Sequence, residues 1–291
     1  MHTRIISISA APYDGYAFPR VLESLASCGV SYVEPAFIVG YTEPFDESAF
    51  TPAQARLYAN WLTESGIGCH AFSSHIDLGG PDALNVFIGR MDFAAYLGAK
   101  VINTNAAART NSASFFKNIE VLARYAEQLD MIIGLENPGD GSDNLFNTAQ
   151  DGIALLEQIN HPRVRLNYDA GNTISHRPQH QPHGVNPAND ALLAIPGCGY
   201  THIKDVRKTS DGYFFVPLGE GDIDCAAILA AVAQTSLNLS IEMPLRLHRA
   251  SNAQPQRNSE PVPLAELEAA IKCSLDFVNI NLASQPSRAA A

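Results

Sequence analysis

Four polar residues, each at the end of a short strand-like run, recur at nearly regular intervals through the second half of the chain. They are Glu136, Asp169, His202 and Glu242, and they follow one another after 33, 33 and 40 residues. A gap of this size accommodates one strand-helix-strand repeat, which takes about 30 residues or more. Because the strands of an α/β barrel are parallel, the four side chains are predicted to meet at one end of it.

The alternation of side chains along these runs supports the same arrangement. In residues 164–169 and 237–242, apolar residues alternate with polar ones, and Asp169 and Glu242 fall on the polar face. Successive side chains of a strand point to opposite faces, so the apolar face would pack beneath helices and the polar face would look into the barrel. Three carboxylates and one imidazole suit a divalent cation such as Mn²⁺, Mg²⁺, Co²⁺ or Zn²⁺.

The rest of the chain reads as a series of strand-helix units. Eight alternating units favour a closed (β/α)8 barrel, the TIM barrel, over an open sheet. We predict one barrel domain over residues 1–283 and a polar tail over 284–291. The predicted strands are 4–9, 30–35, 67–73, 100–105, 131–136, 163–169, 199–204 and 237–242, and the predicted helices are 18–28, 52–65, 82–97, 113–129, 148–159, 187–195, 225–235 and 264–282.

Composition and charge indicate which kinds of molecule the protein can bind and where it is expected to act. A net charge of −11 argues against nucleic acid or an anionic membrane surface. The chain runs into a strand pattern at Arg4 without a signal-like apolar stretch, and no segment is long enough to span a bilayer, so we expect a cytoplasmic protein. The five cysteines show no Cys-x-x-Cys spacing and predict neither a zinc ribbon nor a disulfide framework. A small-molecule partner is expected, and a homo-oligomer is allowed.

The motifs around the four residues resemble the xylose-isomerase-like TIM-barrel superfamily, in its sugar isomerase and epimerase branch. They are Gly-Leu-Glu-Asn at Glu136, Asn-Tyr-Asp-Ala-Gly-Asn at Asp169, His-Ile-Lys-Asp at His202 and Ser-Ile-Glu-Met at Glu242. The resemblance implies that these four residues bind one divalent metal ion, with Mn²⁺ favoured over Mg²⁺, Co²⁺ and Zn²⁺. It also implies that Glu136 and Glu242 act as an acid/base pair, in an isomerase or epimerase that converts a sugar or related polyhydroxy carbonyl compound through an enediolate.

Two positions differ from the ketose 3-epimerases of the tagatose and psicose type. Asn172 stands where those enzymes usually carry a substrate-binding histidine, and Ser142 stands where they carry a second glutamate. Asn172 and the acidic balance also argue against the DNA-repair endonucleases of the superfamily. Two alternatives remain open: a metal-dependent dehydratase of the dehydroshikimate or inosose type, and a non-catalytic ligand-binding barrel.

Further residues are predicted to lie around the metal. We expect His75, Asn172, Lys204 and Arg246 to bind substrate, with an ion pair to a barrel carboxylate as the other interpretation of Lys204. Glu34 faces the site or forms a salt bridge elsewhere.

Neighbouring segments complete the predicted site. Arg165 and Asn167 could support Asp169 from behind. The long connections 170–186 and 243–263 lie on the predicted active face, and we expect the first to cover the metal and influence substrate choice.

Overall fold

The main body of the protein is a parallel barrel. The structure, a computed structural model, describes residues 4–37, 46–181 and 183–283. The strands of the main sheet run in the order β3-β2-β1-β11-β8-β7-β6-β5-β4, and all pair in parallel. Their bounds are β1 Ile6–Ser9, β2 Tyr32–Glu34, β3 Gly68–Cys69, β4 Ala71–Ser73, β5 Val101–Asn105, β6 Ile132–Glu136, β7 Val164–Asp169, β8 Cys198–Ile203 and β11 Leu239–Ile241.

The nine strands occupy eight positions in the barrel. Only His70 separates β3 from β4, so these two short strands together form the strand predicted over 67–73. The sheet is nearly closed because β1 pairs with β11, and because a parallel bridge joins Ala36, just beyond β2, to Ser73 of β4. The predicted (β/α)8 barrel is therefore confirmed. The predicted tail, 284–291, lies outside the described residues, and the domain boundary stays a prediction.

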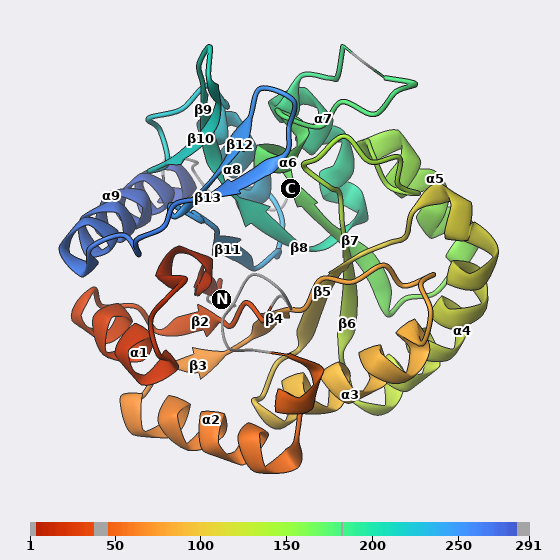
Figure 1. The fold of residues 1–291 in the computed structure, drawn as a ribbon, viewed down its shortest axis with the longest axis horizontal. Helices are drawn as coiled ribbons and strands as arrows, with labels where there is room; N and C mark the ends of the chain where they lie inside the picture. Colours follow the sequence, from red (N-terminus) through yellow and green to blue (C-terminus); the bar gives the residue numbers. More distant parts are fainter. Residues whose placement is uncertain (1–3, 38–45, 182, 284–291) are drawn as a thin grey trace, which may run out of the picture.

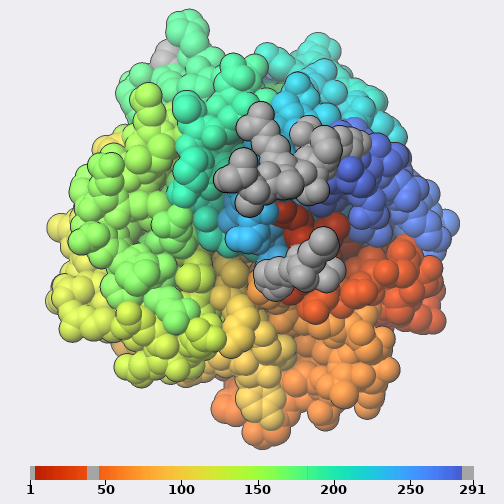
Figure 2. All heavy atoms as spheres, turned by 180° about the vertical axis from the view of Figure 1, so that it is seen from behind, coloured from red at the N-terminus to blue at the C-terminus, as the bar shows by residue number. Residues whose placement is uncertain are grey.

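Helices surround the barrel in chain order (Figure 1). Seen from behind, the red N-terminal segment lies beside the blue C-terminal one, which closes the ring (Figure 2). Ser24 of α1 donates a hydrogen bond to Glu268 of α9 across this junction, at 2.8 Å. The helix bounds are α1 Phe18–Ser27, α2 Pro52–Ser65, α3 Ala83–Tyr96, α4 Ser112–Gln128, α5 Ala149–Ile159, α6 Ala170–Thr173, α7 Pro187–Ala194, α8 Cys225–Ala233 and α9 Leu264–Ala283.

Local sequence explains where several helices begin and end. The Thr148 hydroxyl accepts from the backbone N–H of Asp151, whose carboxylate accepts from the N–H of Thr148, so α5 starts with a capping box. Thr51 caps α2 in a similar way and is followed by a proline at the first helical position. That helix ends at Gly66, which adopts a left-handed conformation with φ of 67° that glycine tolerates without strain.

A second, four-stranded antiparallel sheet lies at the carboxyl end of the barrel (Figure 1). It was not predicted, because no strand was expected between 205 and 236 and residues 243–263 were expected to form a long connection. Three of the strands are short and carry mixed charged and polar residues without regular apolar alternation, and the sheet is completed by a pairing between segments more than 30 residues apart. The sheet has the order β13-β12-β10-β9 and the bounds β9 Asp205–Lys208, β10 Gly212–Val216, β12 Leu247–Ala250 and β13 Pro255–Arg257.

The core divides by chemistry as the strand alternation predicts. Large apolar side chains such as Phe72, Phe87 and Phe115 are fully buried between the sheet and the helices. Buried polar side chains gather near the carboxyl ends of the strands, and they include Ser73, Asn103, Glu136, Asp169, His202 and Glu242. Buried polar groups require hydrogen-bond partners, and this requirement shapes the site described below. Within the described ranges, no helix has the length and apolar character needed to cross a bilayer.

Candidate metal centre and its cavity

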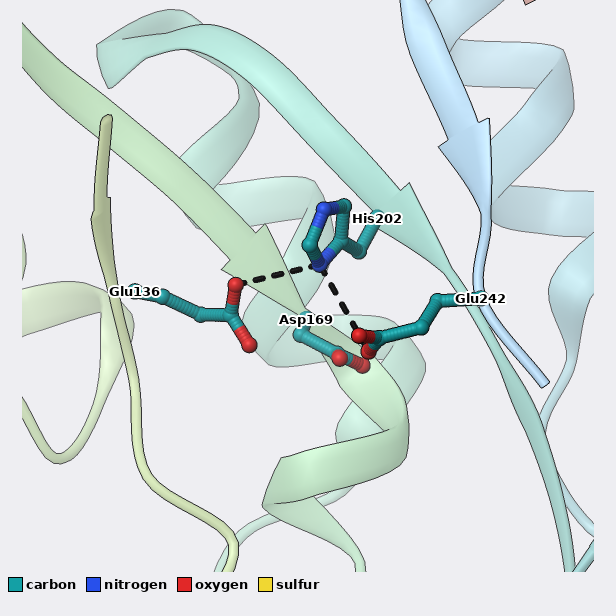
Figure 3. A group of neighbouring side chains, drawn as sticks. All are labelled: Glu136, Asp169, His202 and Glu242. Atoms are coloured by element: carbon teal, nitrogen blue, oxygen red, sulfur yellow. Dashed lines mark ion pairs between the residues drawn. The ribbon is translucent and has the colours of Figure 1, made fainter. Parts of the chain in front are cut away.

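The four side chains singled out by their spacing converge at the carboxyl end of the barrel. Each offers one ligand atom, and these atoms all lie within 4.8 Å of one another. All four residues are buried. Figure 3 shows Glu136 and Glu242 approaching from opposite sides, with the His202 ring and the Asp169 carboxylate between them. Strand register explains the convergence, because β7 and β8 pair Asp169 with His202, and β11 and β8 pair Ser240 with His202.

The His202 ring is held by Glu34 from the second strand. His202 Nε2 lies 3.0 and 3.1 Å from Oε1 and Oε2 of Glu34. The same Oε1 also accepts from Ser73 Oγ at 2.7 Å and from Asn103 Nδ2 at 2.8 Å. A carboxylate in this position favours the tautomer with the proton on Nε2, which leaves the Nδ1 lone pair on the side of Glu136 and Glu242. Nδ1 lies 3.0 Å from Glu136 Oε2 and makes no hydrogen bond among the described residues.

Two asparagines hold the Glu136 carboxylate. Asn167 Nδ2 donates to Glu136 Oε2 at 2.7 Å, and Asn172 Nδ2 donates to Oε1 at 2.9 Å. Asn167 was expected to support Asp169 instead, so the structure corrects its partner. Asp169 is positioned by the backbone, since its Oδ1 accepts from the N–H groups of Gly171 and Asn172 at the start of α6.

Arg165 does not reach the site. Its guanidinium donates to the Pro196 carbonyl at 2.9 Å. The expected support of Asp169 was wrong because a strand rises about 3.3 Å per residue, so a residue four positions earlier on the same face lies near the other end of the barrel.

Lys204 lies among the acidic groups of the cluster. Its Nζ is 2.7 Å from Asp169 Oδ2, forms an ion pair with Glu242, and lies 5.3 Å from the centre of the Phe215 ring. The ion-pair interpretation of this lysine is therefore the one that the structure shows. Lys204 also lines the cavity above the cluster, so a role toward substrate remains a proposal.

The buried charges shift one another's pKa values in opposite directions. Burial raises the pKa of Asp169 to about 6, and the neighbouring Glu136 and Glu242 add to this effect against the attraction of Lys204. Burial would also raise the pKa of Glu242, but Lys204 and His202 outweigh it and hold the pKa at about 2. Three buried carboxylates are costly unless positive charge compensates them. The oxygen-rich donor set with one free imidazole nitrogen fits a single divalent ion.

A cavity of about 290 Å³ opens above the cluster. Three of the four predicted substrate contacts, His75, Asn172 and Lys204, line it, and His75 Nε2 lies 3.7 Å from Glu136 Oε2. The other lining residues are Ala11, Asn105, Glu136, Pro138, Gly139, Asp140, Phe215, Glu242, Pro244, Leu247, His248, Arg249 and Pro255.

Arg246, the fourth predicted contact, is placed elsewhere. Its side chain is buried and donates to the backbone carbonyls of Asp14, Asn258 and Ser259 at 3.2, 3.0 and 2.6 Å. It also lies 3.5 Å from the Asp14 carboxylate. The expectation that Arg246 binds substrate was wrong, because this guanidinium instead fastens the 243–263 segment to the first barrel connection.

The two long connections share the cavity unequally. Of the described residues in 170–186, only Asn172 lines it, whereas the 243–263 segment contributes five residues. Farther along the first connection, Ser175 donates to the Gly139 carbonyl at 2.6 Å, and the buried His176 lies 2.9 Å from Asn147 Oδ1. These contacts turn the segment toward the loop after β6. The structure therefore gives the role of lining the cavity chiefly to the second connection.

Sequence reasoning underused Glu34 and missed Arg249. Glu34 ends its strand just as the four ligand candidates end theirs, and that shared position was the available signal. Arg249 had no comparable signal, because its place depends on the pairing of β12 with β10, which joins segments more than 30 residues apart.

The fold and the cluster place the protein among the TIM barrels that carry a buried acid-imidazole site at the carboxyl ends of their strands. More narrowly, the chain belongs to the xylose isomerase-like TIM barrel family, whose family model matches residues 22–261.

Individual relatives are distant. An L-ribulose 3-epimerase from Methylomonas sp. (strain DH-1) is 30% identical over 128 residues, which is 44% of this chain and 40% of that protein. A xylose isomerase-like TIM barrel protein from Mycobacterium smegmatis, solved with magnesium, superposes with a TM-score of 0.74 at 15% identity, covering 97% of this chain and 98% of its own. A D-psicose 3-epimerase from Clostridium cellulolyticum H10, solved with D-tagatose, gives 0.72 at 16% identity, with coverages of 96% and 99%. At these identities the superpositions establish the fold.

Proposed function

We propose that the protein is a metal-dependent epimerase or isomerase of a sugar or related polyhydroxy carbonyl compound, with Glu136 and Glu242 as the acid/base pair. The observation that carries this proposal is the opposed approach of the two carboxylates (Figure 3). Both reach the same His202 nitrogen, at 3.0 and 3.6 Å. A substrate carbon between them can lose a proton to one carboxylate and regain it from the other. The similarity to an L-ribulose 3-epimerase supports this chemistry.

The proposed metal ligands are Glu136, Asp169, His202 and Glu242. Mn²⁺ is our first expectation for the ion, with Mg²⁺, Co²⁺ and Zn²⁺ as alternatives. When bound, the ion supplies a Lewis acid that polarises the substrate carbonyl and offsets the negative charge of an enediolate.

The surrounding side chains position the two reacting carboxylates. Asn167 and Asn172 fix both oxygens of Glu136, which limits the directions in which it can exchange a proton. Lys204 forms an ion pair with Oε2 of Glu242 and can donate to a substrate oxygen from the cavity wall. His75 faces the cavity beside Glu136 and is placed to bind a substrate hydroxyl group.

The proposal is tested by incubating the Mn²⁺-loaded protein with a panel of ketoses, aldoses, keto acids and inososes in deuterated water. Uptake of deuterium at a carbon whose configuration inverts identifies an epimerase, and uptake at the carbon next to a migrating carbonyl identifies an isomerase. A product lighter by one water, with new ultraviolet absorption, would instead assign a dehydratase.

Glu136→Gln and Glu242→Gln should each reduce turnover about 10²- to 10⁴-fold while the protein retains bound metal, because loss of a positioned acid or base has an effect of that size. Glu157→Gln, on the exposed face of α5, is the matched control. Metal content is measured on the same samples by mass spectrometry. Turnover near the wild-type rate in either variant, with the metal retained, would place the acid/base pair elsewhere.

The expected cytoplasmic location, the absence of nucleic-acid and membrane partners, and a homo-oligomeric state stay predictions from the sequence. Size-exclusion chromatography with light scattering measures the last of these directly.

A further inference from the structure

Arg249 brings an unneutralised positive charge to the wall of the cavity. The residue belongs to β12, is half-buried, and lines the cavity together with His248. Its Nη1 donates to the Ala253 carbonyl at 3.1 Å, and no carboxylate pairs with the guanidinium within the part of the chain that the structure describes. Nearby Arg246, in contrast, donates to three backbone carbonyls and pairs with the carboxylate of Asp14. Arg249 therefore retains donors for a ligand.

The unused edge of the guanidinium lies beside Gly139 and near Asn172. A Cβ atom placed on Gly139 would lie 2.8 Å from Asn172 Oδ1, 2.9 Å from Arg249 Nη2 and 3.0 Å from Arg249 Nε. The Nε–Nη2 edge and Asn172 Oδ1 therefore both border the space beside Gly139. The amide nitrogen of Asn172 donates to Glu136. This edge presents two parallel N–H donors, the geometry that binds a carboxylate or phosphate through two hydrogen bonds. Gly139 keeps the approach open because it has no side chain.

The other groups near Arg249 leave its charge available. Asp140 also lines the cavity, but its Oδ1 accepts from the backbone N–H of Ser142 at 2.9 Å and from the Ser142 hydroxyl. The His248 ring stacks on Phe214, with ring centres 5.0 Å apart and planes inclined by 7°, so it forms a flat wall beside the arginine.

We propose that Arg249 binds an oxyanion at the end of the substrate remote from the metal ligands, so that the preferred substrate is a phosphorylated or acidic polyhydroxy carbonyl compound. The assignment of the anion as part of a substrate rests on the function proposed above, whereas the anion subsite itself does not. A neutral ketose such as the D-tagatose bound by the related epimerase would leave these donors unused. The small cavity suits a short carbon chain that reaches from the cluster to β12.

The test is calorimetric titration of the Mn²⁺-loaded protein with D-ribulose, D-ribulose 5-phosphate and D-gluconate. Wild-type protein should bind D-ribulose 5-phosphate or D-gluconate about 10- to 100-fold more tightly than D-ribulose, the size expected for hydrogen bonds to a charged group. The two anions distinguish a phosphate subsite from a carboxylate subsite. Arg249→Gln should abolish the preference and change D-ribulose binding less than twofold.

Two controls separate the subsite from folding and from direct metal binding by the anion. Arg56→Gln removes an exposed arginine of α2 and should retain the full preference. Gly139→Ala keeps Arg249 but places a methyl group against its Nη2 and against Asn172 Oδ1, and should weaken binding of the anion; metal content is measured on the same sample to separate this effect from any change at Glu136. This second variant keeps the test valid if Arg249→Gln fails to fold.

The outcomes distinguish the two proposals. Equal binding of D-ribulose and both anions by the wild type, or a preference that survives in Arg249→Gln, would overturn the anion subsite. Arg249-dependent anion binding without deuterium exchange into any substrate would support the subsite and refute the proposed function. Deuterium exchange into neutral ketoses without a preference for anions would support the proposed function and refute the anion subsite.

Discussion

Replacing Glu34 by glutamine would test how the orientation of His202 controls metal binding. Glu34 is fully buried, its two oxygens face His202 Nε2 at 3.0 and 3.1 Å, and Oε1 also accepts from Ser73 and Asn103. A carboxamide keeps one acceptor oxygen and replaces the other with an NH₂ group. That group cannot accept a hydrogen bond from Nε2, and the remaining oxygen is shared with Ser73 and Asn103, so the variant holds the tautomer with the proton on Nε2 less firmly and increases the share with the proton on Nδ1. An Nδ1 that carries a proton cannot bind a metal ion.

We expect Glu34→Gln to weaken Mn²⁺ binding about 10- to 100-fold, the usual effect of losing such a supporting contact. At about 1.4 kcal/mol per factor of ten, this is a loss of roughly 1.4–2.8 kcal/mol in binding free energy. Calorimetric titration of Mn²⁺ measures it, with Glu157→Gln on the surface of α5 as the control and circular dichroism as the check on folding. A folded Glu34→Gln variant that binds Mn²⁺ within twofold of the wild type would refute the role assigned to Glu34.

Two further predictions concern stability. Asp205→Ala should lower the free energy of unfolding by about 2–4 kcal/mol, because four backbone N–H groups in residues 206–223 donate to this buried carboxylate. Urea denaturation measures the change, with Asp211→Ala at an exposed position as the control. Equal midpoints for the two variants would contradict the prediction. Removing metal with a chelator should lower stability relative to a sample with free Mn²⁺ at 100 times its dissociation constant, by about 2.7 kcal/mol for a single native-state site. Unfolding curves that coincide with and without Mn²⁺ would contradict the second prediction.

The barrel was predictable because its signals are local. Each strand is a short apolar run, each helix begins or ends with residues such as Thr148 or Gly66 that satisfy terminal backbone groups, and the units repeat in order. Since parallel strands deliver their carboxyl ends to one side, the position of a residue within its own unit was enough to bring Glu136, Asp169, His202 and Glu242 together.

The supporting contacts around the cluster were less accessible, because they connect units that the repeat does not relate. Glu34 and His202 lie 168 residues apart, and only closure of the barrel places the carboxylate behind the imidazole. Asn167 shares a strand with Asp169, yet its amide reaches across to Glu136 on the neighbouring strand. Spacing in sequence indicates which residues reach the same end of the barrel, but it does not indicate which of them touch.

The cavity wall depended most on tertiary structure. Arg246 and Arg249 are three residues apart and both follow Glu242, so the sequence offers little to tell which one lines the cavity. Pairing of β12 with β10 places Arg249 on the cavity, while Asp14 and three backbone carbonyls draw Arg246 away from it. Local periodicity in the sequence specifies the barrel and its four-residue cluster, whereas contacts between distant segments set the orientation of the cluster and the charges that line the cavity.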